Sequence, residues 1–117
     1  MVGNMTIVKL KIADNKLDML VNYIVEELAF DYENHSPDVS ILAVENLSFR
    51  NPSGQFNIVI FKREADFILV DVIAGGGNRG LLDAIGNSEK GYTQLVTKKI
   101  HTYAREQASS VEVLGEL

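Results

Sequence analysis

Two apolar segments joined by only three residues constrain the fold more than any other feature of the chain. Residues 55–63 read QFNIVIFKR, residues 64–66 read EAD, and residues 67–74 read FILVDVIA. The first segment alternates between two sets of side chains: Phe56, Ile58 and Ile60, and Asn57, Val59 and Phe61. Such segments are typical of strands, and strands joined by so short a link run antiparallel. The sequence therefore predicts a β-hairpin over residues 55–74.

Two further strands are predicted before the hairpin. Residues 39–50 are rich in β-branched and apolar side chains, and residues 51–54, NPSG, have the proline and glycine of a turn. The strand at residues 39–50, joined by this turn to the hairpin, gives a meander of three antiparallel strands. Residues 6–12 alternate between apolar side chains and two lysines, Lys9 and Lys11, which predicts a half-buried strand.

Two amphipathic helices are also predicted. The first follows Asp14, a candidate N-cap, and covers residues 15–30. Its apolar stripe consists of Leu17, Leu20, Val21, Ile24 and Leu28. The second is expected from about residue 89 to residue 107, with an apolar face made by Tyr92, Val96, Ile100, Tyr103 and Ala104. Each helix therefore has one face that has to be buried against the rest of the fold.

The predicted order of elements is β-α-β-β-β-α. This order indicates the α+β class, as a two-layer sandwich with the helices packed on one face of a largely antiparallel sheet. A chain of 117 residues can form its own core, and we expect a single domain over residues 1–117. Its core is expected over about residues 5–107, the tail at residues 108–117 is expected to fray, and the polar residues 31–38 are expected to form a loop.

The composition excludes several functions. There are 11 Lys+Arg and 16 Asp+Glu, and the resulting net charge of −5 argues against binding to nucleic acid or to an anionic membrane. The chain has no cysteine, which excludes disulfides, thiolate metal sites and cysteine nucleophiles. Its apolar runs are shorter than the ~20 residues of a membrane-spanning helix, and no signal peptide is visible. We expect a cytoplasmic protein with neither a cofactor nor a metal site.

The order of elements, the hairpin NIVIFKREADFILVDVIAGGG at residues 57–77 and the long final helix together resemble a family of small bacterial proteins that carry a domain of unknown function. The resemblance covers most of the chain, from residue 6 to about residue 103. It rests on this pattern and on the glycine run. It implies the α+β fold, and it implies no active site, so no functional residue is transferred from it.

The stretch AGGGNRG at residues 74–80 contains the G-x-G-x-x-G pattern of dinucleotide-binding loops. A dinucleotide site requires a parallel βαβ unit whose helix begins directly after the glycines, whereas here the preceding strand belongs to an antiparallel hairpin. The glycines are therefore interpreted mainly as the end of a strand. The alternative is an anion-binding nest of backbone N–H groups, formed by Gly75, Gly76, Gly77, Asn78 and Arg79.

Four residues of the kinds that bind metals lie close together in the expected loop: Asp31, Glu33, His35 and Asp38. Nothing in their spacing makes them converge on one ion, and the glycine and final glutamate of a calcium loop are missing. A solvated acidic loop is the favoured interpretation.

Asp71 and His101 are candidates for proton transfer. Asp71 lies among apolar residues and is expected to point away from the core, with Glu45 and Arg63 as candidate cross-strand neighbours. A buried Asp71 would be a catalytic candidate, although exposure is the commoner case. His101 lies on the polar face of its helix without a partner at the spacing of a catalytic triad. A solvated basic face is the favoured interpretation of His101, and a docking patch for an acidic partner is the alternative.

Met19, Tyr23 and Phe30 cluster on the first helix, opposite its core-facing stripe. Contiguous exposed apolar side chains usually mark an interface. An intramolecular cover, formed by the tail or by the residues around Leu81, is an equally supported alternative.

Three functions follow from these features. The favoured one is a non-catalytic interaction module that self-associates as a homo-oligomer or binds another protein. The second is a binder of a small anion or ligand at residues 75–80. An enzyme that uses Asp71 or His101 is the least supported, because the sequence has no nucleophile–base pair, metal-ligand spacing or cofactor motif.

Overall fold

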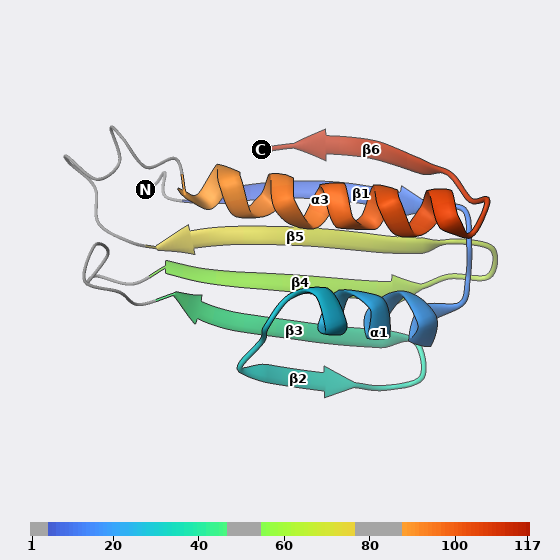
Figure 1. Cartoon of the computed structure of the whole chain (residues 1–117), viewed down its shortest axis with the longest axis horizontal. Coiled ribbons are helices and arrows are strands. Elements are labelled where there is room, and N and C mark those ends of the chain that lie inside the picture. The colour runs from blue at the N-terminus through green and yellow to red at the C-terminus, as the bar shows by residue number, and fades with distance from the viewer. Residues whose placement is uncertain (1–4, 47–54, 77–87) are drawn as a thin grey trace.

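The computed structural model describes residues 5–46, 55–76 and 88–117. Their elements are β1 (Thr6–Ile12), α1 (Leu17–Glu27), β2 (Tyr32–His35), β3 (Val39–Asn46), β4 (Gln55–Arg63), β5 (Ile68–Gly76), α3 (Ser88–Glu106) and β6 (Val111–Glu116). The strands form one antiparallel sheet in the order β2-β3-β4-β5-β1-β6 (Figure 1). The predicted α+β class with an antiparallel sheet is confirmed. The predicted order of elements lacks β2 and β6.

The predicted meander forms the centre of the sheet. β4 pairs with β5 along all nine of its residues, and β3 pairs with the other side of β4. The link between β4 and β5 is closed by the N–H of Glu64, which donates to the carbonyl of Phe67 at 2.8 Å. β1 pairs antiparallel with the free side of β5, so the N-terminal strand lies inside the sheet rather than at its edge.

Strand β2 lies where the sequence predicted a loop. All four of its residues are exposed, yet they pair in register with β3. The turn between β2 and β3 is held by Ser36, whose N–H and hydroxyl both donate to the carbonyl of Val39, at 2.8 and 3.0 Å. The prediction failed because β2 buries no side chain and so has no apolar periodicity. Its polar side chains suit an edge strand, since they discourage pairing with another chain.

The tail that was expected to fray instead forms β6, which pairs with β1. The chain reverses after α3 at Ala108, whose φ is +56°, and Ser109 Oγ donates to the carbonyl of Ala13 at 2.8 Å. At the far end, the N–H of Leu117 donates to the carbonyl of Ile7 at 2.8 Å. The tail is ordered by pairing with a strand from the opposite end of the sequence, which no local pattern reveals.

Both helices lie on one side of the sheet (Figure 1). The two predicted apolar faces are buried against it, including Leu20 and Ile24 of α1 and Val96 and Ile100 of α3. Among the described residues, neither helix is long and apolar enough to cross a membrane. The core therefore lies between one face of the sheet and the two helices.

Candidate interaction surface

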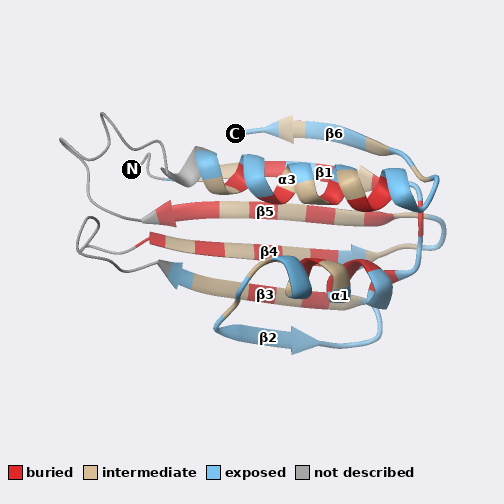
Figure 2. Cartoon of the chain, in the orientation of Figure 1, coloured by how far each residue is buried: buried red, intermediate tan, exposed pale blue. Residues whose placement is uncertain are grey.

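The side of the sheet that faces away from the helices carries many apolar side chains. On β5, Ile68, Val70 and Val72 are buried, and the side chains between them point to the other side and are only partly buried (Figure 2). β4 alternates in the same way. We call this second side the open face. Its partly buried apolar residues on the four central strands are Ile7, Val39, Ile41, Ala43, Phe56, Ile58, Ile60, Leu69 and Ile73, none of which belongs to the core cluster or packs against it.

The register of the sheet places four of these side chains in a line across the strands, with a neighbour at each end. Paired residues of antiparallel strands point to the same face. The successive pairs join Tyr32 of β2, Ala43 of β3, Ile58 of β4, Ile73 of β5 and Ile7 of β1. Beyond Ile7 lies Leu117, which is bonded to it through both backbone groups and is 77% exposed. We call this line the apolar row. It spans the full width of the sheet without a charged side chain.

The neighbouring lines of the open face carry the charges. On one side of the apolar row, Ile41 and Ile60 are followed by Asp71 and Lys9. On its other side, Glu45 is followed by Phe56 and Gly75. The outermost line contains Lys62, Leu69, Lys11 and Glu112. The strands therefore bring three lysines and three carboxylates to the open face, which balance, whereas the whole chain has a net charge of −5.

Asp71 lies within the open face and is neutralised by a neighbour. Its Oδ1 lies 3.1 Å from Nζ of Lys9, and the two side chains are 36% and 48% exposed. The predicted orientation of Asp71 agrees with this position. The predicted cross-strand neighbours, Glu45 and Arg63, were wrong, because the register pairs Asp71 with Ile60 and Lys9. The carboxylate forms a partly exposed ion pair in an apolar setting.

Lys11 makes a further contact on the open face. Its Nζ lies 4.5 Å from the centroid of the Phe67 ring, a separation at which a cation is attracted to the face of an aromatic ring.

Two of the four residues of the expected acidic loop, Glu33 and His35, bond to each other, and the other two have partners elsewhere. His35 is hydrogen-bonded to Ser40 Oγ at 3.0 Å and to Glu33 Oε1 at 2.9 Å. Asp31 accepts from the backbone N–H of Glu45 at 3.2 Å. Within residues 5–46, 55–76 and 88–117, no three His, Asp or Glu side chains are placed to hold a metal ion. These side chains stabilise the β2–β3 hairpin and its surroundings.

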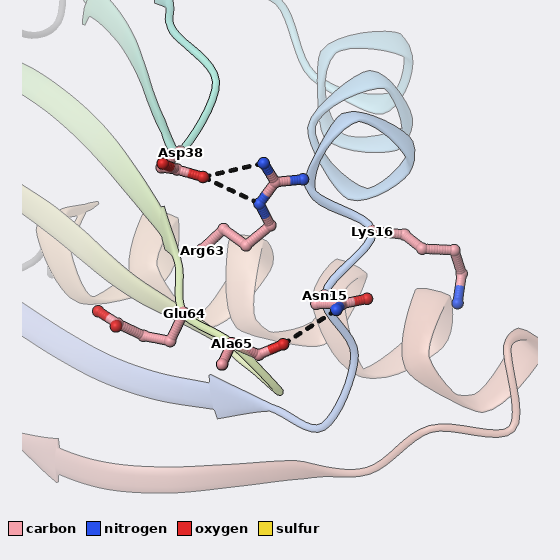
Figure 3. A pocket seen from close by; sticks show the side chains of 6 residues that line it. All are labelled: Asn15, Lys16, Asp38, Arg63, Glu64 and Ala65. Atoms are coloured by element: carbon pink, nitrogen blue, oxygen red, sulfur yellow. Dashed lines mark hydrogen bonds and ion pairs between the residues drawn. The ribbon is translucent and has the colours of Figure 1, made fainter.

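A polar hollow lies at the end of the sheet where β4 turns into β5 (Figure 3). It is lined by Asn15, Lys16, Asp38, Arg63, Glu64 and Ala65. Nε and Nη2 of Arg63 donate to Oδ1 of Asp38 at 3.1 and 2.9 Å, and Asn15 Nδ2 donates to the carbonyl of Ala65 at 3.0 Å. The guanidinium is already paired, so these contacts tie the β2–β3 turn and the start of α1 to the sheet.

The prediction of Asp14 as the N-cap was wrong, because α1 begins after Lys16, which is its N-cap. Asp14 lies two residues earlier, with its side chain almost fully buried. Oδ1 accepts from the N–H of Lys16 at 2.8 Å and lies 3.1 Å from Nζ of the same residue. Oδ2 is buried without a hydrogen-bond partner among the described residues. Because this oxygen is inaccessible, Asp14 organises the approach to α1 and is not positioned to hold a ligand from solution.

The glycine stretch is described only in part. Gly75 and Gly76 are the last residues of β5, opposite Phe56 and Gln55. Gly77, Asn78 and Arg79 lie outside the described residues, so the anion-binding nest stays a prediction. The antiparallel pairing of β5 on both sides does not provide the parallel unit of a dinucleotide site.

The three residues of the predicted helical interface have different surroundings. Met19 is 45% exposed, whereas Tyr23 and Phe30 are partly buried and pack against the core. The rings of Tyr23 and Tyr103 lie 5.4 Å apart at 51°, so α3 is the neighbour of Tyr23. An interface at these residues stays a prediction. His101 is exposed on the outer side of α3.

Sequence reasoning missed the open face, although the signal was present. Both sets of alternating residues in residues 55–63 are largely apolar, and the two helical stripes can bury only one of them. No protein-family model, no curated protein and no solved structure matches the chain. The resemblance to a family of small bacterial proteins therefore stays a prediction, and the functional inference rests on the open face.

Proposed function

We propose that the protein is a non-catalytic interaction module that self-associates through the open face of its sheet. The observation that carries this proposal is the apolar row, from Tyr32 through Ile58 and Ile73 to Leu117. A two-layer arrangement, with helices on one side only, leaves these side chains without a covering helix in the part of the chain that the structure describes. A solvated side of an antiparallel sheet normally carries polar residues, and contiguous apolar patches commonly mark interaction sites.

The size of the open face supports a protein partner. Five strands about 4.8 Å apart and about seven residues long cover roughly 570 Å² in projection. The relief of the side chains raises the accessible area towards the ~800 Å² per partner of a stable interface.

The balance of charges on the open face supports a second copy as that partner. Like charges that face each other across an interface cost several kcal/mol, and the chain as a whole is acidic. The strand residues of the open face contribute Lys9, Lys11 and Lys62 against Glu45, Asp71 and Glu112, with no net charge. Two copies can therefore stack without the repulsion that their overall charge would cause elsewhere.

Sedimentation equilibrium of the intact chain tests the proposal. The wild type is expected at twice the monomer mass of 12.9 kDa. Ile58→Lys places an ammonium group in the middle of the apolar row and is expected to sediment as a folded monomer, because burying an unpaired charge is costly. Circular dichroism checks that the variant keeps its fold.

Two matched variants identify the surface. Leu95→Lys makes the same kind of change at an apolar residue of α3 that is 41% exposed, and it is expected to leave the mass unchanged. Met19→Lys makes the change at the predicted helical interface. A monomeric wild type would contradict the proposal, and so would dissociation by Met19→Lys but not by Ile58→Lys.

A further inference from the structure

We infer, on the basis of the proposed self-association, that the two copies stack with a two-fold axis along the apolar row, across the strands. In this arrangement each residue of the row faces its own counterpart, and the two ends of every strand exchange places. The two sheets lie inside and the helices outside, which gives four layers. The inference rests on comparing what each possible axis brings into contact.

An axis across the strands brings Glu45 opposite Ile41, and this is the only charge of the two lines beside the apolar row that comes to lie opposite an isoleucine. This axis lays the line that contains Ile60 over the partner's line that contains Phe56 and Gly75. Ile60 then lies opposite an aromatic ring. Asp71 lies opposite Gly75, which has no side chain, so the carboxylate keeps its pair with Lys9 (3.1 Å) without an apolar group forced against it.

An axis along the strands, between β4 and β5, is less favourable. It lays the line that contains Ile60 and Asp71 over the same line of the partner in reverse. Ile60 then faces Asp71, and Ile41 faces Lys9. Each charge would be desolvated against an isoleucine, and burying a charge away from polar partners carries a large cost. In these lines, two charges face isoleucines with the axis along the strands and one does so with the axis across them, so the pattern of the open face favours the axis across the strands.

Single cysteines distinguish the two axes, because the natural chain contains none. Ala43 of β3 and Ile7 of β1 lie near opposite ends of the apolar row, three strand spacings or about 14 Å apart. Facing sheets lie about 10 Å apart, beyond the Cα separation of about 4.4–6.8 Å that a disulfide allows. A short bismaleimide is therefore the suitable cross-linker.

With the axis across the strands, Ala43→Cys alone and Ile7→Cys alone are each expected to form a cross-linked dimer of twice the monomer mass. His101→Cys, on the exposed side of α3, is the control for random collisions and is expected to stay monomeric on a denaturing gel. All three variants are first shown by sedimentation to keep the mass of the wild type.

The other outcomes separate the inference from the proposal on which it rests. Cross-linking only in a mixture of Ala43→Cys and Ile7→Cys would overturn the axis and keep the open face as the interface. A dimer that none of these cysteines cross-links would contradict both, and a monomeric wild type would remove the proposed function itself.

Discussion

At the scale of single residues, folding changes the pKa of two buried tyrosines. The hydroxyl groups of Tyr92 and Tyr103 are buried without a hydrogen-bond partner among the described residues. Burial raises the pKa of both to about 12, and the negative charge of Asp14 contributes further at Tyr103. An ionised phenol would lose its hydration there, so the folded state favours the neutral form.

This shift predicts a loss of stability in alkali. An unfolded tyrosine has a pKa of about 10, so between about pH 10 and pH 12 the unfolded chain releases protons that the folded chain keeps. The stabilising contribution is complete below pH 10 and is lost as the pH rises through the folded pKa. We expect Tyr103→Phe to make the free energy of unfolding fall less steeply with pH than it does in the wild type.

Urea denaturation at several pH values from 8 to 11 measures this effect. Tyr92→Phe removes the other buried phenol, whose pKa is also raised to about 12, and it is expected to reduce the slope in the same way. An identical pH dependence for the wild type and Tyr103→Phe would show that the hydroxyl of Tyr103 is not buried in solution.

At the scale of the elements, the sheet is completed by two edge strands that bury little. β2 is exposed at every residue, and in β6 only Val111 packs against the core. β6 nevertheless covers the edge of β1, with a bulge that leaves Leu114 opposite no residue of β1. These strands depend on backbone hydrogen bonds more than on side-chain burial, which makes them sensitive to changes in the ladder.

Removing β6 is therefore expected to weaken the fold more than changing its side chains. A chain ending at Ser110 loses the whole ladder, including both hydrogen bonds between Ile7 and Leu117. At roughly 0.5–1.5 kcal/mol for each hydrogen bond, these two alone correspond to about 1–3 kcal/mol. The measurement is the free energy of unfolding in urea, by circular dichroism.

The control for this truncation is Leu114→Ser, at the unpaired bulge residue, which is 49% exposed. It keeps the backbone ladder and is expected to change the stability by no more than about 0.5 kcal/mol. Equal stability of the truncated and full-length chains would mean that β6 does not hold to β1 in solution.

At the scale of the whole molecule, the fold is unequal on its two sides. One side of the sheet packs against α1 and α3, and the other exposes the open face, centred on Ile58 and Ile73. If a second copy covers this face, folding and association are coupled, because the associated state is favoured by mass action.

The midpoint of thermal unfolding is therefore expected to rise with protein concentration in the wild type. Over a hundredfold range of concentration, Ile58→Lys should show a constant midpoint, since a monomer unfolds independently of concentration. If the midpoint of the wild type stayed constant over this range, at protein concentrations well above the dissociation constant measured by sedimentation, folding and association would not be coupled. Leu95→Lys serves again as the control that keeps the dependence.

Much of the fold could be predicted from the sequence because burial leaves a local period. The alternation in residues 55–74 predicted the β4–β5 hairpin, and the stripes through Leu20 and Ile100 predicted two helices whose buried residues are confirmed. The limits of α3 were predicted to within about one residue. In each case the pattern lies within one element, and the hydrophobic effect acts on that element whatever its neighbours are.

Tertiary structure alone decided the features that bear on function. The pairing of β1 between β5 and β6, and the pairing of β6 with a strand from the other end of the chain, depend on contacts that no local period records. The same holds for the neighbours of Asp71. The alternation in β4 showed that both of its faces are apolar, but only the packing of the helices determined which face is covered. The open face exists because two helical stripes can bury one side of a sheet and not two.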